Sequence, residues 1–223
     1  KDNHHDAPEF ITRWIDCLTK EMRETQQEVQ LNNLFGFTMN SIFKTKKNKT
    51  FSIQGENNST KTAKIENDSE FSIHKNTEFY LSLNVTIGFN SKEEKEKEHN
   101  LVDCIKEIEQ EEKISNENEP DKFKWNEFNQ LPPILQINLN RSEAVSSMEN
   151  GYQKLSTPVN FPEELDIHST KYDLYAFIAH IGSAQLGHCF CHIRNFTSNQ
   201  WYFYDESKVV LDDGIESLLN SIE

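Results

Sequence analysis

A histidine and an aspartate near the C-terminal end of the chain have the spacing of a general base and the carboxylate that orients it. His188 follows Gly187 in one predicted strand, and Asp205 ends the next strand, 17 residues later. A turn centred on residues 197–198 places His188 opposite or diagonal to residues 205–207. A carboxylate that accepts a hydrogen bond from one imidazole nitrogen fixes the tautomer, and the other nitrogen is then free to act as a base.

Three predicted strands would hold this pair in place. The segment Tyr172–Ile181 is apolar on both faces, which predicts a central strand. His188–Arg194 and Trp201–Asp205 are joined by the polar residues NFTSNQ, which predicts a hairpin. The same spacing also fits a hydrogen-bonded strand histidine beside an aspartate that merely ends a strand, so both interpretations stay open at this point.

The upstream residues predict further strands and two helices. Apolar side chains recur every three or four residues over 6–26, where Asp6 would be the N-cap and Glu9 completes a capping-box pattern. Strict alternation predicts a strand over Phe79–Ile87 with one buried face, and helical spacing predicts a second helix over Leu101–Ile108. Strands outnumber helices and do not alternate with them, which predicts an α+β fold with a mostly antiparallel sheet.

The composition excludes several classes of protein. A net charge of −14 disfavours nucleic acid as a direct partner, because phosphate binding needs clustered Lys and Arg; it suits a basic partner or peptide tail. No apolar run reaches the roughly 18 residues of a membrane span, and four scattered cysteines without a CxxC pair suggest neither a disulfide framework nor a zinc site. The N-terminus has no signal peptide and no Met. We therefore expect a segment of a longer, intracellular protein.

The residues around His188 resemble the histidine box of the ubiquitin-specific proteases, papain-like cysteine peptidases that remove ubiquitin from proteins. In that family a strand ending in His-x-Gly is followed by Gly-His-Tyr and then by Trp-Tyr-x-Phe-Asp-Asp-x-x-Val. The matching residues in this sequence are His180 and Gly182, then Gly187 and His188, then Trp201, Tyr202, Asp205 and Val209.

Four further segments resemble blocks of the same family, in the same order. HHDAPEFITRWIDCL is similar to Gln-Gln-Asp-Ala-x-Glu-Phe-Leu, and LFGFTMNSIF resembles the Leu-Phe-Gly-Gly segment. FYLSLNV resembles a Phe-x-x-Leu-x-Leu strand, and LPPILQINLNR resembles Leu-Pro-Pro-Val-Leu-x-Ile-His-Leu-x-Arg. The resemblance covers nearly the whole chain and implies the family's hand-shaped fold of thumb, fingers and palm.

On this resemblance, residues 1–223 form one partial catalytic domain that lacks the N-terminal part of the thumb. Residues 1–35 would be the end of the thumb, 36–130 the fingers and part of the palm, and 131–223 the palm with the histidine box. The family's four zinc-binding cysteines of the fingers are absent, as in the zinc-free branch of the family. We therefore expect no metal and no cofactor, and fingers held by packing and hydrogen bonds.

The resemblance also implies the reaction and the partners. The reaction is thiol-dependent hydrolysis of the isopeptide bond after the C-terminal glycine of ubiquitin, with His188 as general base and then acid, oriented by Asp205. The partners would be ubiquitin and ubiquitinated proteins, in the cytoplasm, the nucleus or both. The residues expected along the groove for the basic ubiquitin tail are Asp6, Glu9, His180 and Gly187; for Asp6 this role and the N-cap role are compatible.

The chain departs from the family at the nucleophile. The box Asn-x-Gly-Asn-Thr-Cys is absent, together with the polar residue that helps form the oxyanion hole, and neither Cys17, Cys104 nor Cys191 matches it. Cys189 replaces the usual Tyr after the histidine and should point to the opposite face of the strand from His188. We therefore expect the nucleophile upstream of Lys1.

A catalytically inactive, ubiquitin-binding scaffold of the same fold is the alternative. Retention of both His188 and Asp205 favours the enzyme, because an inactive copy needs neither. The loose first block and Cys189 at the Tyr position favour the scaffold.

Overall fold

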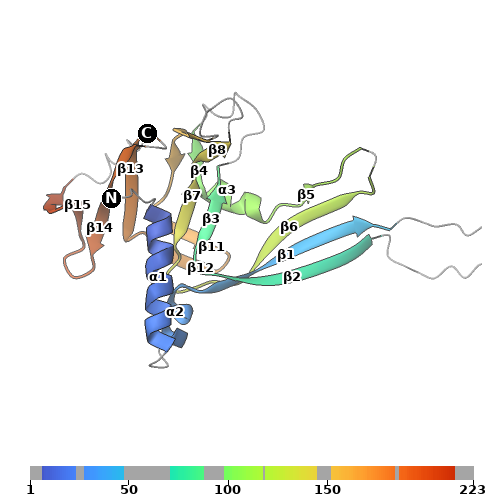
Figure 1. Ribbon diagram of the computed structural model, residues 1–223, viewed down its shortest axis with the longest axis horizontal. Coiled ribbons are helices and arrows are strands. Elements are labelled where there is room, and N and C mark those ends of the chain that lie inside the picture. The colour runs from blue at the N-terminus through green and yellow to red at the C-terminus, as the bar shows by residue number, and fades with distance from the viewer. Residues whose placement is uncertain are drawn as a thin grey trace, which may run out of the picture.

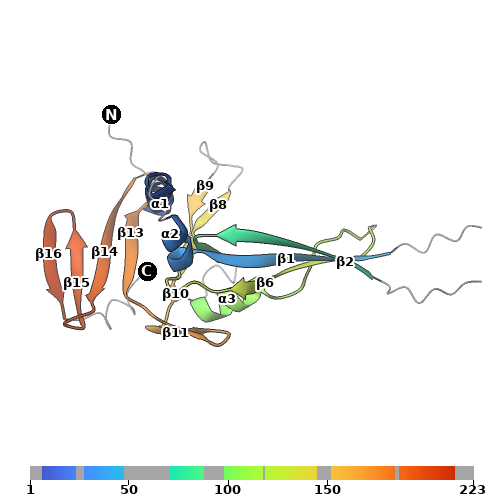
Figure 2. The same ribbon diagram turned by 90° about the horizontal axis from the view of Figure 1, so that it is seen from below.

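A computed structural model describes residues 7–23, 28–47, 71–87, 98–117, 119–144, 152–183 and 186–213, and the statements below concern these residues. Their strands pair mostly antiparallel and are accompanied by short helices, which confirms the α+β class. A long arm of strands extends from a body that ends in a second sheet on the opposite side (Figures 1 and 2). Asp6 lies outside the described residues.

Helix α1 (Ala7–Arg23) confirms the helix expected over residues 6–26 and is followed by α2 (Glu28–Phe35). Within α1, Ile15 is the buried residue and lies on the apolar face that the spacing predicted. The second predicted helix is α3 (Leu101–Ile108), with its N-cap at Asn100, whose side chain accepts a hydrogen bond from the backbone nitrogen of Val102. None of the described helices has the length and apolar composition needed to cross a membrane.

The main core forms where α3 packs against a parallel pair of strands, β3 (Leu83–Thr86) and β7 (Ile137–Asn140). Leu83 and Val85 are almost completely buried, at 1% and 0% exposed, and alternate with exposed polar residues. The other buried members of this cluster are Phe37, Met39, Ile87, Leu101, Cys104, Ile105, Val159, Leu165 and Ile167.

The strand expected over Phe79–Ile87 is wrong in its first part, because the chain bends at residues 81–82. Phe79 belongs to the end of a different strand, pairs with Thr38, and is 54% exposed. The alternation in the sequence therefore runs across two strands in two sheets, and only its second half faces the core.

The arm is the sheet β2–β1–β6–β5, in which each adjacent pair is antiparallel (Figure 1). Its strands have the bounds β1 (Phe37–Lys46), β2 (Phe71–Tyr80), β5 (Glu112–Lys113) and β6 (Lys122–Gln130). β1 lies in the middle of this sheet and pairs with β2 along its full length.

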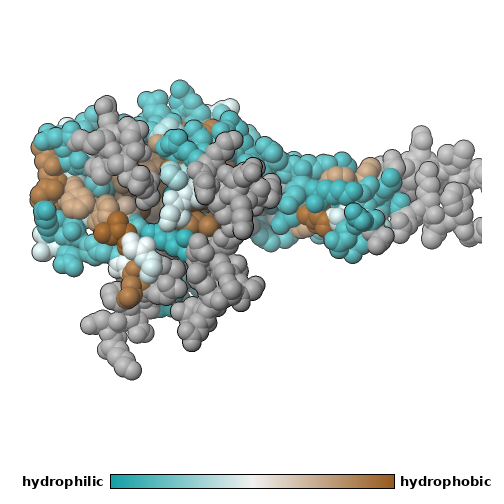
Figure 3. All heavy atoms as spheres, turned by 90° about the horizontal axis from the view of Figure 1, so that it is seen from above, coloured by the Kyte–Doolittle hydropathy of each residue, from teal (hydrophilic) through white to brown (hydrophobic). Residues whose placement is uncertain are grey.

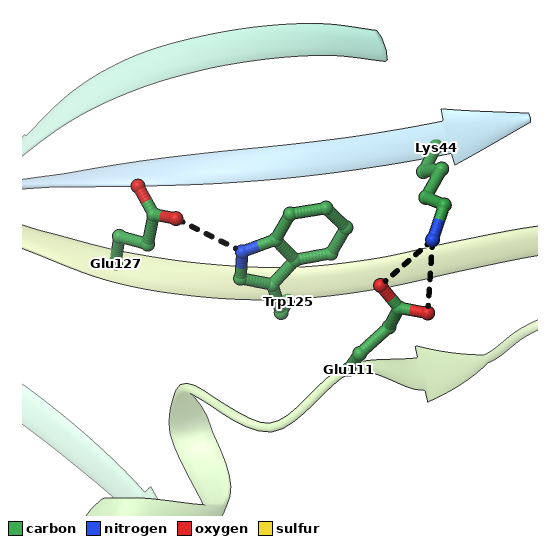
Figure 4. A network of polar contacts seen from close by, with 4 residues as sticks. All are labelled: Lys44, Glu111, Trp125 and Glu127. Carbon is green, nitrogen blue, oxygen red and sulfur yellow. Dashed lines mark hydrogen bonds and ion pairs between the residues drawn. The ribbon is translucent and has the colours of Figure 1, made fainter. Parts of the chain in front are cut away.

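Two polar contacts lie on the arm, one between β1 and the residue before β5 and one within β6 (Figure 4). Lys44 Nζ lies 3.3 Å from Glu111 Oε2 and over two phenylalanine rings, at 4.9 and 5.1 Å from their centroids. Trp125 Nε1 donates a hydrogen bond to Glu127 Oε1 at 3.1 Å. Among the described residues, no group of three or more His, Cys, Asp and Glu side chains could hold a metal ion.

Three further pairs of short strands form separate two-stranded sheets. They are β4 (His99–Asn100) with β10 (Val159–Asn160), β8 (Ser142–Ala144) with β9 (Tyr152–Lys154), and β11 (Glu164–Ile167) with β12 (Thr170–Asp173).

The second sheet is an antiparallel meander in the order β13–β14–β15–β16, at the left of Figures 1 and 2. Asn195 pairs with Gln200, which confirms the predicted hairpin and its turn. Exposed apolar residues of the sheet include Ile178, Val209 and Leu211, and hydrophobic residues gather at this end of the molecule in Figure 3. The strand bounds are β13 (Ala176–Gly182), β14 (Gly187–Asn195), β15 (Gln200–Asp205) and β16 (Lys208–Asp212).

The prediction of a central strand over Tyr172–Ile181 is wrong. The segment is divided between β12 and β13, and β13 lies at the edge of the described sheet, where Ile178 is 49% exposed. The break has a hydrogen-bonding cause: Leu174 donates its backbone N–H to Glu163, whereas the carbonyl of Tyr175 accepts from Arg194 in the other sheet. The segment is apolar on both faces because its two parts, in β12 and β13, belong to different sheets.

Because Leu83 lies in the core, we expect its truncation to destabilise the fold strongly. We expect Leu83→Ala to lower the free energy of unfolding by about 2–5 kcal/mol, since it leaves a cavity between β3 and its neighbours. The matched control is Ile73→Ala on β2, which is 68% exposed and should change stability by no more than about 0.5 kcal/mol. Urea denaturation followed by circular dichroism measures both, and equal costs would contradict this placement of the core.

Candidate functional site

The predicted contact between His188 and Asp205 is present. His188 is the second residue of β14 and Asp205 is the last residue of β15, and His188 Nε2 contacts Asp205 Oδ1. A neutral imidazole that donates Nε2–H to this carboxylate keeps its lone pair on Nδ1, so Nδ1 is the nitrogen available as a base. The two side chains are 42% and 35% exposed, so a reactant can reach them.

A tight turn presents Asp205. Asp205 pairs with Lys208 across the two residues that link β15 to β16, and Glu206 in that turn has a positive φ of 51°. The pairing of β14 with β15 reaches Cys191 and Tyr204, one residue short of Asp205. The carboxylate therefore stands at the tip of the β15–β16 hairpin. The contact agrees with both interpretations of the pair, and the catalytic role stays a prediction.

The loop before His188 brings His180 and Gly187 together, and their expected role beside the ubiquitin tail stays a prediction. Gly182 has a φ of 106°, which favours glycine, and the backbone nitrogen of Ser183 donates to the carbonyl of Leu186 at 2.8 Å. A Cβ on Gly187 would collide with the imidazole Nε2 of His180. The absence of a side chain at Gly187 therefore lets the His180 ring lie against the backbone next to His188.

Lys154 makes contacts near the site that the sequence did not predict. Its Nζ donates to two carbonyl oxygens of β13, that of His180 at 2.8 Å and that of Gly182 at 3.1 Å. Lys154 ends β9 and thereby ties the β8–β9 pair to the end of β13 that precedes the loop. A lone lysine in an irregular segment carries no periodic signal, so the sequence alone could not assign this contact.

Glu9 lies in the first turn of α1, as expected. Its Oε1 forms an ion pair with Arg13 one turn later, at 2.6 Å, and its side chain is 47% exposed. A solvent-exposed pair of this kind holds its partners weakly, so the carboxylate can exchange Arg13 for another cation. The expected role of Glu9 beside a basic tail stays a prediction, as does that of Asp6.

The described cysteines differ in exposure, and two of them have raised thiol pKa values. Cys17 and Cys189 are exposed, Cys104 is buried and Cys191 is half-buried. Burial raises the pKa of the Cys191 thiol, and burial together with two nearby carboxylates raises the pKa of the Cys104 thiol. A raised thiol pKa lowers the thiolate fraction at neutral pH, which is the opposite of what an activated nucleophile needs.

Comparison with known proteins gives one family. The sequence pattern of the family described as "Ubiquitin carboxyl-terminal hydrolase" matches residues 1–218. "Ubiquitin carboxyl-terminal hydrolase 12" of Saccharomyces cerevisiae is 35% identical over 96 residues, which is 38% of this chain and 7% of that protein. "Ubl carboxyl-terminal hydrolase 18" of Mus musculus is 35% identical over 95 residues, 35% of this chain and 25% of that protein.

A third relative aligns over a longer stretch. "Ubiquitin carboxyl-terminal hydrolase 48" of Danio rerio is 31% identical over 134 residues, which is 52% of this chain and 13% of that protein. The chain thus spans a quarter or less of the length of each of these relatives.

The cysteine environments predict an order of alkylation. At pH 7 we expect iodoacetamide to modify Cys17 and Cys189 before Cys104 and Cys191, because the latter two are less accessible and have raised thiol pKa values. The rates at Cys104 and Cys191 should rise as the pH rises toward those pKa values. Peptide mass spectrometry measures the order, and Cys191 reacting first at pH 7 would contradict it.

Proposed function

Because this chain belongs to the ubiquitin carboxyl-terminal hydrolase family, whose pattern matches residues 1–218, we propose that it is the histidine-bearing part of a thiol-dependent deubiquitinase. The observation that carries the proposal is the contact of His188 Nε2 with Asp205, which leaves Nδ1 free as a base on an accessible side chain. The curated relatives bear names of ubiquitin or ubiquitin-like carboxyl-terminal hydrolases, which agrees with that class of reaction.

The proposed reaction needs a cysteine from outside this chain. Nδ1 of His188 takes the proton of that thiol, and the thiolate attacks the carbonyl carbon of the C-terminal glycine of ubiquitin. The imidazolium then gives the proton to the leaving lysine amine, and a thioester remains. Water attacks the thioester, with His188 again as the base, and frees the ubiquitin carboxylate and the thiol. Asp205 orients the ring throughout by its contact with Nε2.

The ubiquitin tail is proposed to lie along the loop before His188. Gly187 allows an extended backbone to come close, and the ring of His180 lies beside it. Figures 1 and 2 place α1 beside β13, so Glu9 in the first turn of α1 is a candidate for contact with the basic tail. Asp6 lies outside the described residues and is a candidate through the family resemblance alone. The net charge of −14 agrees with a basic ligand.

We further propose that the chain is one partial catalytic domain with the hand-like arrangement of its family. Residues 1–35 would end the thumb, 36–130 would form the fingers and part of the palm, and 131–223 would complete the palm. The elongated arm supports the fingers, and the β13–β16 sheet supports the palm (Figure 1). Ubiquitin and ubiquitinated proteins are the proposed partners, in the cytoplasm, the nucleus or both.

A second candidate is an inactive scaffold that binds ubiquitin through the same surfaces. Cys189 at a position where the family has Tyr favours it, as do the raised pKa values of the Cys104 and Cys191 thiols, which lower their thiolate fractions.

The two candidates differ in the effect of removing the imidazole. In the longer protein that we propose contains this chain, His188→Ala should lower hydrolysis of a fluorogenic amide of ubiquitin by about 100-fold or more, because general acid–base catalysis supplies about 10²–10⁴-fold. The matched control is His168→Ala, which removes another imidazole–carboxylate contact, to Glu109 at 3.0 Å, and should leave turnover unchanged. Equal turnover in His188→Ala and wild type would contradict the assignment.

Residues 1–223 alone should not hydrolyse that substrate, because none of their cysteines is the proposed nucleophile. Turnover by this chain that Cys189→Ser abolishes would overturn our interpretation of Cys189.

A further inference from the structure

Strand β14 makes a second imidazole–carboxylate contact, four residues beyond His188. His192 Nδ1 lies 2.8 Å from Asp212 Oδ2, and the two side chains are 2% and 11% exposed. The two contacts differ in setting, since His188 is accessible whereas His192 is enclosed. The buried pair belongs to no step of the proposed reaction, so its presence needs a separate explanation.

Aromatic rings hold the His192 imidazole on several sides. It stacks on Phe177 with ring centroids 4.7 Å apart and planes inclined by 14°, and it also contacts Phe203 at 5.1 Å and Phe190 at 5.8 Å. Its Nε2 is buried and has no hydrogen-bond partner among the described residues. A buried nitrogen without a partner costs free energy, which a phenylalanine in the same place would avoid. What the imidazole adds to the packing is its hydrogen bond to Asp212.

That hydrogen bond spans three strands. His192 pairs with Phe203 of β15, and Phe203 pairs with Val210 of β16, so these residues share one face of the sheet. Asp212 lies two residues beyond Val210 on the same face. The contact therefore passes over β15 and ties the end of β16 directly to β14.

The catalytic carboxylate depends on how the β15–β16 hairpin lies against β14. Asp205 stands at the tip of that hairpin, beyond the last paired residues Cys191 and Tyr204, whereas the backbone of His188 pairs with Ile181 of β13. A small rotation of the hairpin on β14 would therefore move Asp205 relative to His188. Contacts of this kind need alignment within about 0.5 Å to be productive.

We propose that His192 and Asp212 are positioning residues, which fix the β15–β16 hairpin on β14 so that Asp205 meets His188 Nε2. The two imidazole–carboxylate contacts then secure the hairpin at both of its ends, one buried and one at the site. The consequence for catalysis rests on the proposed function, whereas the effect on the His188–Asp205 contact does not.

The test measures how fast the His188 Nε2 proton exchanges with water in residues 1–223, by ¹H–¹⁵N NMR with labelled histidine. In the wild type, Asp205 should slow the exchange of the His188 Nε2 proton with water. We expect His192→Phe, which keeps an aromatic ring in the stack, to speed this exchange at least tenfold while the protein stays folded. Asp212→Asn, which keeps the volume of the side chain, should also speed this exchange. It serves as the test of the proposal if His192→Phe does not fold.

Two controls separate positioning from general loosening of the structure. Glu109→Gln removes the negative charge from the exposed contact with His168 and should leave the His188 exchange rate unchanged. The double variant His192→Phe/Asp212→Leu replaces the buried polar pair by apolar side chains, and should unfold at the wild-type temperature or above while the fast exchange at His188 persists. A melting temperature that recovers together with slow exchange would show a role in stability alone and would overturn the proposal.

An unchanged exchange rate in folded His192→Phe and Asp212→Asn would also overturn it. Activity is measured separately in the longer protein, where both variants should lower kcat and leave KM unchanged. Absence of all hydrolysis in the wild-type protein would refute the proposed function, and the NMR result would still decide the positioning role.

Discussion

The register of β14 against β15 is the constraint on which the site depends. Because side chains alternate between the faces of a strand, a slip of one residue would turn His188 away from Asp205. The turn between the strands fixes this register locally. Asn195 Oδ1 accepts hydrogen bonds from the backbone nitrogens of Thr197 and Ser198, at 2.9 and 3.1 Å, and Asn199 takes a positive φ of 56° that asparagine tolerates.

Local chemistry explains which parts of the structure the sequence could predict. The β14–β15 hairpin and the contact at its open end follow from alternation and turn residues, and α3 follows from helical spacing. The bend at residues 81–82 and the edge position of β13 could not be predicted in this way, because each depends on partners distant in sequence. The same is true of Lys154, which bonds to residues 26 and 28 positions away.

The two imidazole–carboxylate contacts on β14 differ in burial: the exposed one is accessible to a reactant, and the buried one is proposed to hold strands together. His192 is surrounded by aromatic rings and is 2% exposed, so water and other hydrogen-bonding groups do not readily reach it. His188 lies where a reactant can reach it, next to a loop shaped by Gly182 and Gly187. Both the spacing of the hairpin and the family motif pointed to the His188–Asp205 contact. Asp212 lies beyond the residues of the predicted hairpin and of that motif, so the His192–Asp212 contact was not predicted.

Ubiquitin that carries an electrophilic alkyne in place of its C-terminal carboxyl group tests the central claim most directly, because it bonds to the thiol that the histidine activates. The proposed longer protein is treated with this reagent and digested, and the modified cysteine is located by mass spectrometry. We predict an adduct on one cysteine outside residues 1–223. An adduct on Cys17, Cys104, Cys189 or Cys191, or no adduct at all, would contradict the view that this chain supplies the base for an external nucleophile.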